Sequence, residues 1–183
     1  MQNRFISSLR ELRNVRTMTQ CAILVAIYLV LNNFSFYITP SLKFTVSYVA
    51  IAAIAMIAGP IAAFICGGAV EVLGFALHPG PGGYFPGFTI TTMLTGLVMG
   101  CFFYRREIKL WRVIAARSIV VTVLHLGLNT FWLSMIYHDA FLVLLPGRIF
   151  KTVALLPLEV ALILLTLKTV NIAVSRLAKH SNS

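Results

Sequence analysis

Residues 44–77 read FTVSYVAIAAIAMIAGPIAAFICGGAVEVLGFAL, and this stretch decides the fold. It carries one charged residue, Glu71, and Gly59-Pro60 interrupts it. Proline lacks the backbone N–H that a helix interior needs, and glycine accepts unusual dihedral angles, so this dipeptide predicts a turn. The stretch therefore predicts two apolar helices, Phe44–Ala58 and Ile61–Leu77, and not a single long one.

Similar apolar runs fill most of the chain. Its 183 residues are 59% hydrophobic and 11% charged, with a mean hydropathy of +0.90, whereas soluble domains average about 25% charged residues. A helix of about 20 apolar residues crosses the hydrocarbon core of a bilayer. We therefore predict an all-α integral membrane bundle of six transmembrane helices, forming a single domain over residues 1–183. The six predicted spans are Thr17–Tyr37, Phe44–Ala58, Ile61–Leu77, Phe88–Tyr104, Val113–Tyr137 and Arg148–Val174.

The basic residues predict how the bundle is oriented. They gather in the N-terminal segment 1–16, at the link between the fourth and fifth spans, and at the end of the sixth span with the tail 175–183. These residues are Arg4, Arg10, Arg13, Arg16, Arg105, Arg106, Lys109, Arg112, Arg117, Lys168, Arg176 and Lys179. With six spans they share one face, and the positive-inside rule places that face and both termini in the cytoplasm. The formal charge of +10 is thus a topology signal, and no nucleic-acid partner is expected.

The predicted outer loops hold few charges and many aromatic residues. Lys43, Arg148 and Lys151 are the basic residues on that side, which favours an anionic ligand. The breaker-rich loop HPGPGGYFPG at 78–87 can fold inward, although interfacial aromatic belts are also common in membrane proteins. We predict a ligand site at this level, where a flat heterocycle stacks. Its predicted aromatic, loop and fifth-span residues are Tyr84, Phe85, Pro86, Gly87, Phe88, Asn129 and Trp132.

Two Pro-Gly pairs mark predicted helix starts at the outer face. Pro86-Gly87 precedes the fourth span, and Pro146-Gly147 precedes the sixth span at Arg148. A helix N-terminus carries the positive end of the helix dipole, so either position suits an anionic group.

Ionisable residues inside the hydrocarbon are costly and are therefore functional candidates. Glu71 lies in the outer half of the third span, where it accepts hydrogen bonds from a ligand or pairs with Arg148. Glu159 and His125 lie at similar depth and are interpreted as a hydrogen-bonded pair, with a proton relay as the alternative. The sequence has no phosphate loop, no zinc-protease motif and no paired cysteine motif, so no catalytic or metal-binding residues are predicted.

At this point the chain resembles the substrate-binding (S) components of energy-coupling factor (ECF) vitamin transporters of bacteria. The resemblance rests on six spans in a short chain, a basic N-terminal segment, the small residues Ala22 and Ala26 in Ala-x-x-x-Ala, and outer loops suited to cover a ligand. Phe85-Pro86-Gly87-Phe88-Thr89 and the stretch 145–151, LPGRIFK, resemble the folate-specific members.

This resemblance implies a multi-pass protein of the bacterial cell membrane that binds folate or a related vitamin from outside and needs no cofactor. It implies partners, namely a membrane coupling protein with two ATPase subunits, and maps the family's docking motif onto Ala22 and Ala26. For folate, Glu71 and Asn129 suit the N–H groups of the pterin edge, while Arg148, Lys151 and Lys43 suit the glutamate carboxylates.

Three alternatives stay open at this stage. The first is an S component for another vitamin, such as pantothenate, a pyrimidine or a pyridoxine-like compound. The second is a small autonomous proton-coupled transporter that uses Glu71, Glu159 and His125. The third is an intramembrane enzyme, for which the motifs supply neither a nucleophile–base pair nor a metal-ligand set.

Overall fold

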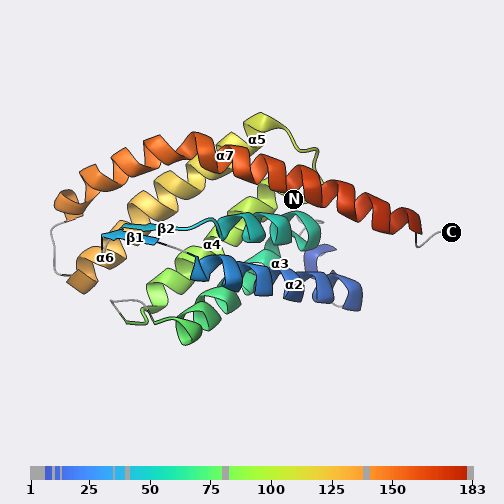
Figure 1. Ribbon diagram of the computed structural model, residues 1–183, viewed down its shortest axis with the longest axis horizontal. Helices are drawn as coiled ribbons and strands as arrows, with labels where there is room; N and C mark the ends of the chain where they lie inside the picture. Colours follow the sequence, from blue (N-terminus) through green and yellow to red (C-terminus); the bar gives the residue numbers. More distant parts are fainter. Residues whose placement is uncertain are drawn as a thin grey trace.

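The computed structural model describes residues 7–9, 11–12, 14–34, 36–39, 42–79, 83–137 and 141–180, with the side chains of 36–39, 42–44, 137, 141–148, 150, 151 and 175–180 outside that description. The described chain is a bundle of helices with one short hairpin (Figure 1). Its elements are α2 (Val15–Asn33), β1 (Phe36–Thr39), β2 (Leu42–Phe44), α3 (Tyr48–Leu77), α4 (Pro86–Phe103), α5 (Leu110–Ile119), the π-helix η1 (Val120–Asn129), α6 (Thr130–Tyr137) and α7 (Phe141–His180). Five helices of the described chain are long and apolar enough to cross a membrane, when α5, η1 and α6 are taken together.

The turn predicted at Gly59-Pro60 is confirmed. Gly59 has φ +88° and ψ −176°, a left-handed conformation that interrupts α3 and that glycine adopts without the steric penalty of a Cβ atom. In Figure 1 the first half of α3 leads away from β2, and the second half leads back toward the loop before α4. The five candidate spans therefore contain six helical passes. The first turn of α2 and the end of α7 lie at the same end of the bundle.

The boundaries of the first two predicted spans differ from the observed helices. α2 ends at Asn33, and the chain then forms an antiparallel hairpin in which Phe36 pairs with Phe44 and Tyr37 pairs with Lys43. Aromatic and β-branched residues favour strands, and here they form strands at positions where the apolar pattern alone extends the helices.

The predicted helix start at Pro146-Gly147, before Arg148, is wrong. α7 begins at Phe141 and continues through Pro146 and Gly147. Membrane helices tolerate such breakers because neighbouring groups satisfy the freed backbone atoms. Arg148 therefore lies within the second turn or later of a helix and not at a helix N-terminus.

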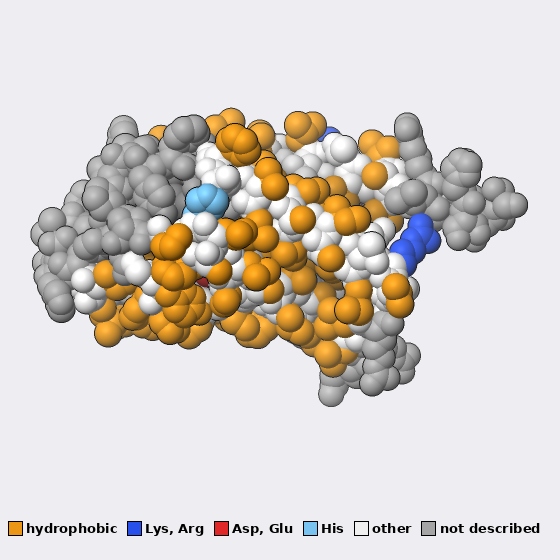
Figure 2. Space-filling view, turned by 60° about the horizontal axis from the view of Figure 1, so that its bottom comes forward, with side chains coloured by type: hydrophobic (Ala, Val, Ile, Leu, Met, Phe, Trp, Pro, Cys, Tyr) orange, Lys and Arg blue, Asp and Glu red, His pale blue; other side chains and the backbone are white. Residues whose placement is uncertain are grey.

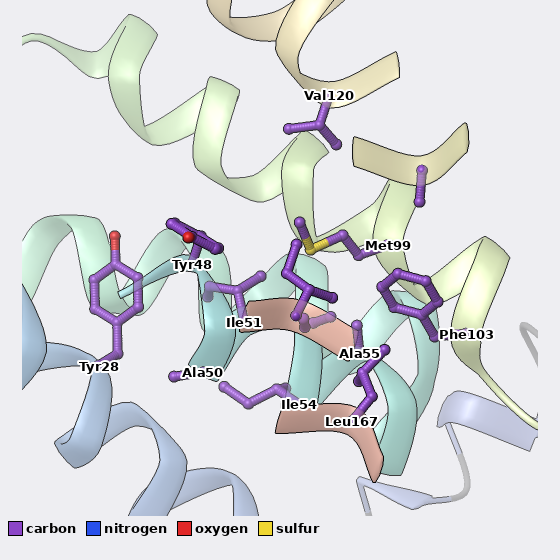
Figure 3. Close-up of a cluster of buried hydrophobic side chains, with 14 of the residues drawn as sticks. Tyr28, Tyr48, Ala50, Ile51, Ile54, Ala55, Met99, Phe103, Val120 and Leu167 are labelled. Carbon is purple, nitrogen blue, oxygen red and sulfur yellow. The ribbon is translucent and has the colours of Figure 1, made fainter. Parts of the chain in front are cut away.

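The first half of α3 forms the centre of the bundle. Ala50, Ile51, Ala52, Ala53, Ile54 and Ala55 are each at most 2% exposed. Ile51, Ile54 and Ala55 lie among Met99 of α4, Val120 of η1 and Leu167 of α7, as Figure 3 shows. A helix surrounded on all sides has no polar face, which explains why this segment is the most uniformly apolar part of the chain.

The second half of α3 packs directly against α4 through glycines. A Cβ atom on Gly96 would meet the carbonyl group of Ala63, and one on Gly100 would meet the backbone of Pro60. A Cβ atom on Gly67 would lie 2.7 Å from the carbonyl oxygen of Thr92. Small residues let helix backbones approach closely in lipid, where van der Waals packing drives association.

The outer surface of the bundle is apolar. Figure 2 shows hydrophobic side chains over most of one face, with few charged groups among its described residues. Large exposed side chains include Ile23 and Val30 on α2, Val123 on η1 and Leu165 on α7. Such a surface suits contact with lipid acyl chains, so the chain is a multi-pass membrane protein.

Candidate functional site

The aromatic residues predicted at the start of α4 and on the fifth span come together in space. The ring centroids of Phe85 and Trp132 are 5.5 Å apart, and those of Phe85 and Phe88 are 5.9 Å apart. Phe131 extends the group, with its ring 5.2 Å from Trp132. These distances lie in the range of favourable aromatic pairs. We call Phe85, Phe88, Phe131 and Trp132 the aromatic box.

Gly87 lets α4 approach the box. Pro86 occupies the first turn of α4, where its missing N–H costs nothing, and Phe85 is the N-cap residue. A Cβ atom on Gly87 would lie 2.5 Å from a ring atom of Phe85 and 2.6 Å from one of Trp132. The predicted helix start at Pro86-Gly87 is thus confirmed, and glycine is required there by the close approach of the indole.

Two polar atoms beside the box have no partner among the described residues. They are the side-chain oxygen Oδ1 of Asn129 and the indole nitrogen Nε1 of Trp132, and both atoms are buried. Asn129 is the last residue of η1, and Trp132 lies one turn further along in α6. Because buried polar groups are nearly always hydrogen-bonded, one acceptor and one donor are available here to a bound molecule.

Tyr84 lies at the edge of this region. Its ring contacts Phe75 of α3, with centroids 5.3 Å apart, and its hydroxyl group hydrogen-bonds with that of Thr89 at 2.9 Å. The side chain is 46% exposed. Tyr84 therefore ties the loop before α4 to the end of α3.

Glu71 has contacts of its own. One carboxylate oxygen accepts a hydrogen bond of 3.1 Å from the hydroxyl group of Thr92 on α4. The role of Glu71 and Asn129 at the pterin edge stays a prediction.

Three basic residues are predicted to bind an anionic tail, and their side chains lie outside the described part of the structure. The backbone of Lys43 lies in β2, and those of Arg148 and Lys151 lie in α7. Their role as ligands stays a prediction.

A second polar cluster, in the interior, was not predicted as a site. The Nε atom of Arg117 donates a 2.8 Å hydrogen bond to Glu159 of α7, and the guanidinium carbon lies 4.4 Å from the ring centre of Tyr48. Arg117 is 4% exposed, so it lies in the interior of the bundle and not on an exposed link between the fourth and fifth spans. Its position inside the apolar run 113–137 was the signal that identifies it, because arginine within a span is costly unless it is paired.

Ala22 and Ala26 lie on an exposed face of α2. Both are exposed, as are Ile23 and Ile27 beside them. The four-residue spacing puts the two alanines on one side of the helix. Internal packing against this chain's own helices, the alternative explanation for the motif, does not account for them.

The fold and the site define a membrane-embedded helical protein with an aromatic cluster and partnerless polar atoms between its described helices. A family model described as "ECF transporter, substrate-specific component" matches residues 16–167. The chain belongs to this family of transporter components and is not an enzyme.

Two related proteins and one solved structure are similar to this chain. The chain is 30% identical over 152 residues to the "Folate transporter FolT" of Clostridium novyi (strain NT), a match covering 83% of this chain and 88% of that protein. It is 28% identical over 155 residues to the "Folate transporter FolT" of Leuconostoc mesenteroides, covering 81% and 83%. A solved structure, "Crystal structure of FolT bound with folic acid", matches with a TM-score of 0.74 and 32% identity, covering 80% of this chain and 88% of that one.

Proposed function

We propose that this chain captures folate at the outer face of the bacterial cell membrane as the substrate-binding component of an ECF importer. The observation that carries the proposal is the aromatic box with the partnerless Asn129 Oδ1 and Trp132 Nε1 atoms beside it. The similar proteins named as folate transporters, and the similar structure that holds folic acid, support the choice of ligand.

The chemistry of folate matches the residues at this end of the bundle. An aromatic ring of folate stacks against Phe85 and Trp132, and polar atoms attached to that ring take the hydrogen bonds that Asn129 and Trp132 offer. The two carboxylates of the glutamate tail suit Arg148, with Lys151 and Lys43 as further cations. Charge-assisted hydrogen bonds contribute about 1.5–3 kcal/mol each, so two of them with one stacked ring support tight binding.

The energy for uptake comes from partners in this proposal. A membrane coupling protein with two ATPase subunits docks on the exposed face of α2 at Ala22 and Ala26. Small residues on that face let a partner helix approach closely. The clusters of basic residues support a cytoplasmic location for both termini and for this docking end.

The test measures folate binding to the purified full chain in detergent, with tryptophan fluorescence as the readout. The chain has two tryptophans, and Trp111 is 58% exposed at the start of α5. The variant Trp111→Phe leaves Trp132 as the only reporter, so folate should quench its fluorescence in a saturable way with one site per chain. Trp132→Phe, the matched control, should lose most of that quenching.

If folded protein that has been stripped of ligand does not bind folate, folate is excluded as the ligand. The family assignment would be unaffected. A panel of other vitamins would then identify the ligand. Accumulation of substrate by the chain alone in proteoliposomes under a pH gradient would instead support the autonomous transporter, since an S component without partners does not accumulate its ligand.

A further inference from the structure

Buried polar atoms without partners are concentrated along one membrane span. Among the described residues five such side-chain atoms occur. One of them is Arg112 Nε, at the start of α5. The Nη1 atom of Arg112 donates to the Glu107 carbonyl group. The other four are Tyr48 Oη, Arg117 Nη1, Asn129 Oδ1 and Trp132 Nε1. Three of these four belong to the span α5–η1–α6, and the fourth, Tyr48, packs against Arg117.

The inner two of these atoms belong to a compact cluster built by three elements. Arg117 of α5 donates to Glu159 of α7, with 5% and 15% of their side chains exposed. Tyr48, at the start of α3, covers one face of the guanidinium group. Figure 3 shows Tyr48 within the interior of the bundle, in the same view as Val120 of η1.

The charges of Arg117 and Glu159 cancel, but several hydrogen-bonding positions in this cluster remain unused. The Arg117 Nη1 atom is a donor, the Tyr48 hydroxyl group can donate or accept, and the Glu159 carboxylate has about four acceptor positions, of which Arg117 Nε uses one. A neutral ligand edge that presents an acceptor beside N–H donors is complementary to such a set. An anion is not required, because Glu159 already neutralises Arg117.

The open atoms of this ion pair need further hydrogen-bond partners. A buried pair repays its desolvation only when further hydrogen bonds satisfy the remaining donors and acceptors. Each unsatisfied buried group costs about 1–3 kcal/mol, so the Arg117 Nη1 atom and the Tyr48 hydroxyl group are expected to find partners in the working protein.

The inner cluster and the aromatic box lie along one helical line. Arg117 and Asn129 are twelve residues apart on the span, which at about 1.5 Å per residue is at most about 18 Å. η1 occupies the interval, and π-helical segments are frequent at functional sites. An elongated ligand with a heterocycle at one end can contact both clusters.

We propose that Tyr48, Arg117 and Glu159 form the inner end of the ligand site and bind the hydrogen-bonding edge of the ligand's heterocycle. The inference rests on the proposed function. For folate, the pyrimidinone edge of the pterin contacts the inner cluster, the aminobenzoate ring stacks in the aromatic box, and the glutamate tail lies nearest the outer loops. This moves the pterin edge away from Glu71 and Asn129, where the sequence analysis puts it.

The sharpest test is Tyr48→Phe in the full chain. This change removes a hydroxyl group that has no described partner and keeps the ring over Arg117. Affinity for folate and for pteroic acid, which lacks the glutamate, should fall about five- to tenfold, the loss of one hydrogen bond. Affinity for p-aminobenzoylglutamate, which lacks the pterin, should be unchanged, and the ligand-free protein should melt no lower than wild type.

Tyr104→Phe is the matched control. Tyr104 lies in the turn after α4, and its hydroxyl group already has a partner, the hydroxyl group of Ser7 at 3.1 Å. It should leave all three affinities unchanged. Wild-type affinity for folate in Tyr48→Phe, or an equal loss for all three compounds, would overturn the inner site. Failure of the wild-type chain to bind folate would instead overturn the proposed function.

A second variant removes the charges together. Replacing a buried ion pair by apolar residues of similar volume is often neutral for stability, so Arg117→Met with Glu159→Met should fold. It should lose at least tenfold in affinity for pteroic acid while p-aminobenzoylglutamate binds as before. A folded double variant with wild-type affinity for pteroic acid would show that the pair is structural only.

Discussion

The hydroxyl group of Ser8 donates a 2.8 Å hydrogen bond to the carbonyl oxygen of Ala58, fifty residues further along the chain. The hydroxyl oxygen of Ser8 in turn accepts hydrogen bonds from the N–H groups of Ile61 and Ala62, at 3.2 and 3.4 Å. The break at Gly59 leaves these backbone groups without their helical partners. Ser8, which is fully buried, thus serves the second half of α3 as an N-cap residue would, although it comes from the N-terminal segment.

Ser8→Ala should therefore destabilise the bundle. Removing the hydroxyl group leaves buried backbone groups unsatisfied, at a cost of about 1–3 kcal/mol. Thermal unfolding of the purified protein in detergent measures the effect. Ser7→Ala is the control, because its hydroxyl group has a partly buried contact with Tyr104. Equal losses in the two variants would mean that Ser8 does not cap the break.

Gly87→Ala should weaken folate binding more than tenfold. The added methyl group collides with Phe85 and Trp132 and pushes the indole out of the aromatic box. Equilibrium binding to the purified variant checks this. Gly127→Ala provides the comparison, since a Cβ atom there would lie 3.7 Å from the Thr122 carbonyl oxygen, an ordinary contact. If the Gly87→Ala variant bound folate as tightly as the wild type and the Gly127→Ala variant do, Gly87 would have no part in shaping the site.

Ala22→Trp or Ala26→Trp should abolish uptake in cells and leave folate binding intact. The bulky side chain blocks close approach of a partner helix on α2, while the aromatic box lies on other elements. Leu165→Trp, at a position 64% exposed on α7, controls for a bulky residue at the lipid surface. Parallel loss of uptake and binding would contradict the docking role of the two alanines.

Arg148→Ala should weaken binding of folate more than binding of a bare pterin. The guanidinium group is expected to pair with the glutamate tail, which a pterin lacks. Competition binding with the two compounds measures the difference. An equal loss for both would move Arg148 away from the tail.

The sequence predicts the fold well where hydropathy and backbone chemistry agree. The apolar runs identify the spans, and Gly59-Pro60 identifies the break in α3, because both depend on local properties of the residues. The ends of the spans are less predictable. Phe36 and Tyr37 are apolar enough for a helix, and only their pairing with residues 43 and 44 makes them a strand.

The site was predictable in part for the same reason. Phe85, Gly87 and Trp132 combine aromatic character with a breaker that fixes the start of α4, and the structure brings them together. The burial of Arg117 was not predictable from the count of basic residues, because such a count does not record depth. Its partnership with Glu159 joins residues 42 apart and depends on how α5 packs against α7. The π-helical register of η1 likewise has no signal in composition.

The glycine contacts between α3 and α4 have a consequence for movement. Where backbones touch directly, as Gly100 does at Pro60, neither helix can slide or rotate without a collision, so the pair moves as one rigid body. In α2 and in residues 152–174 of α7, only 17% of the apolar window is buried in the bundle. Spin labels on α3 and α4 should keep a constant separation when ligand is released, while distances from α4 to α2 or α7 change. Release of the ligand would then be a displacement of peripheral helices around a fixed two-helix centre.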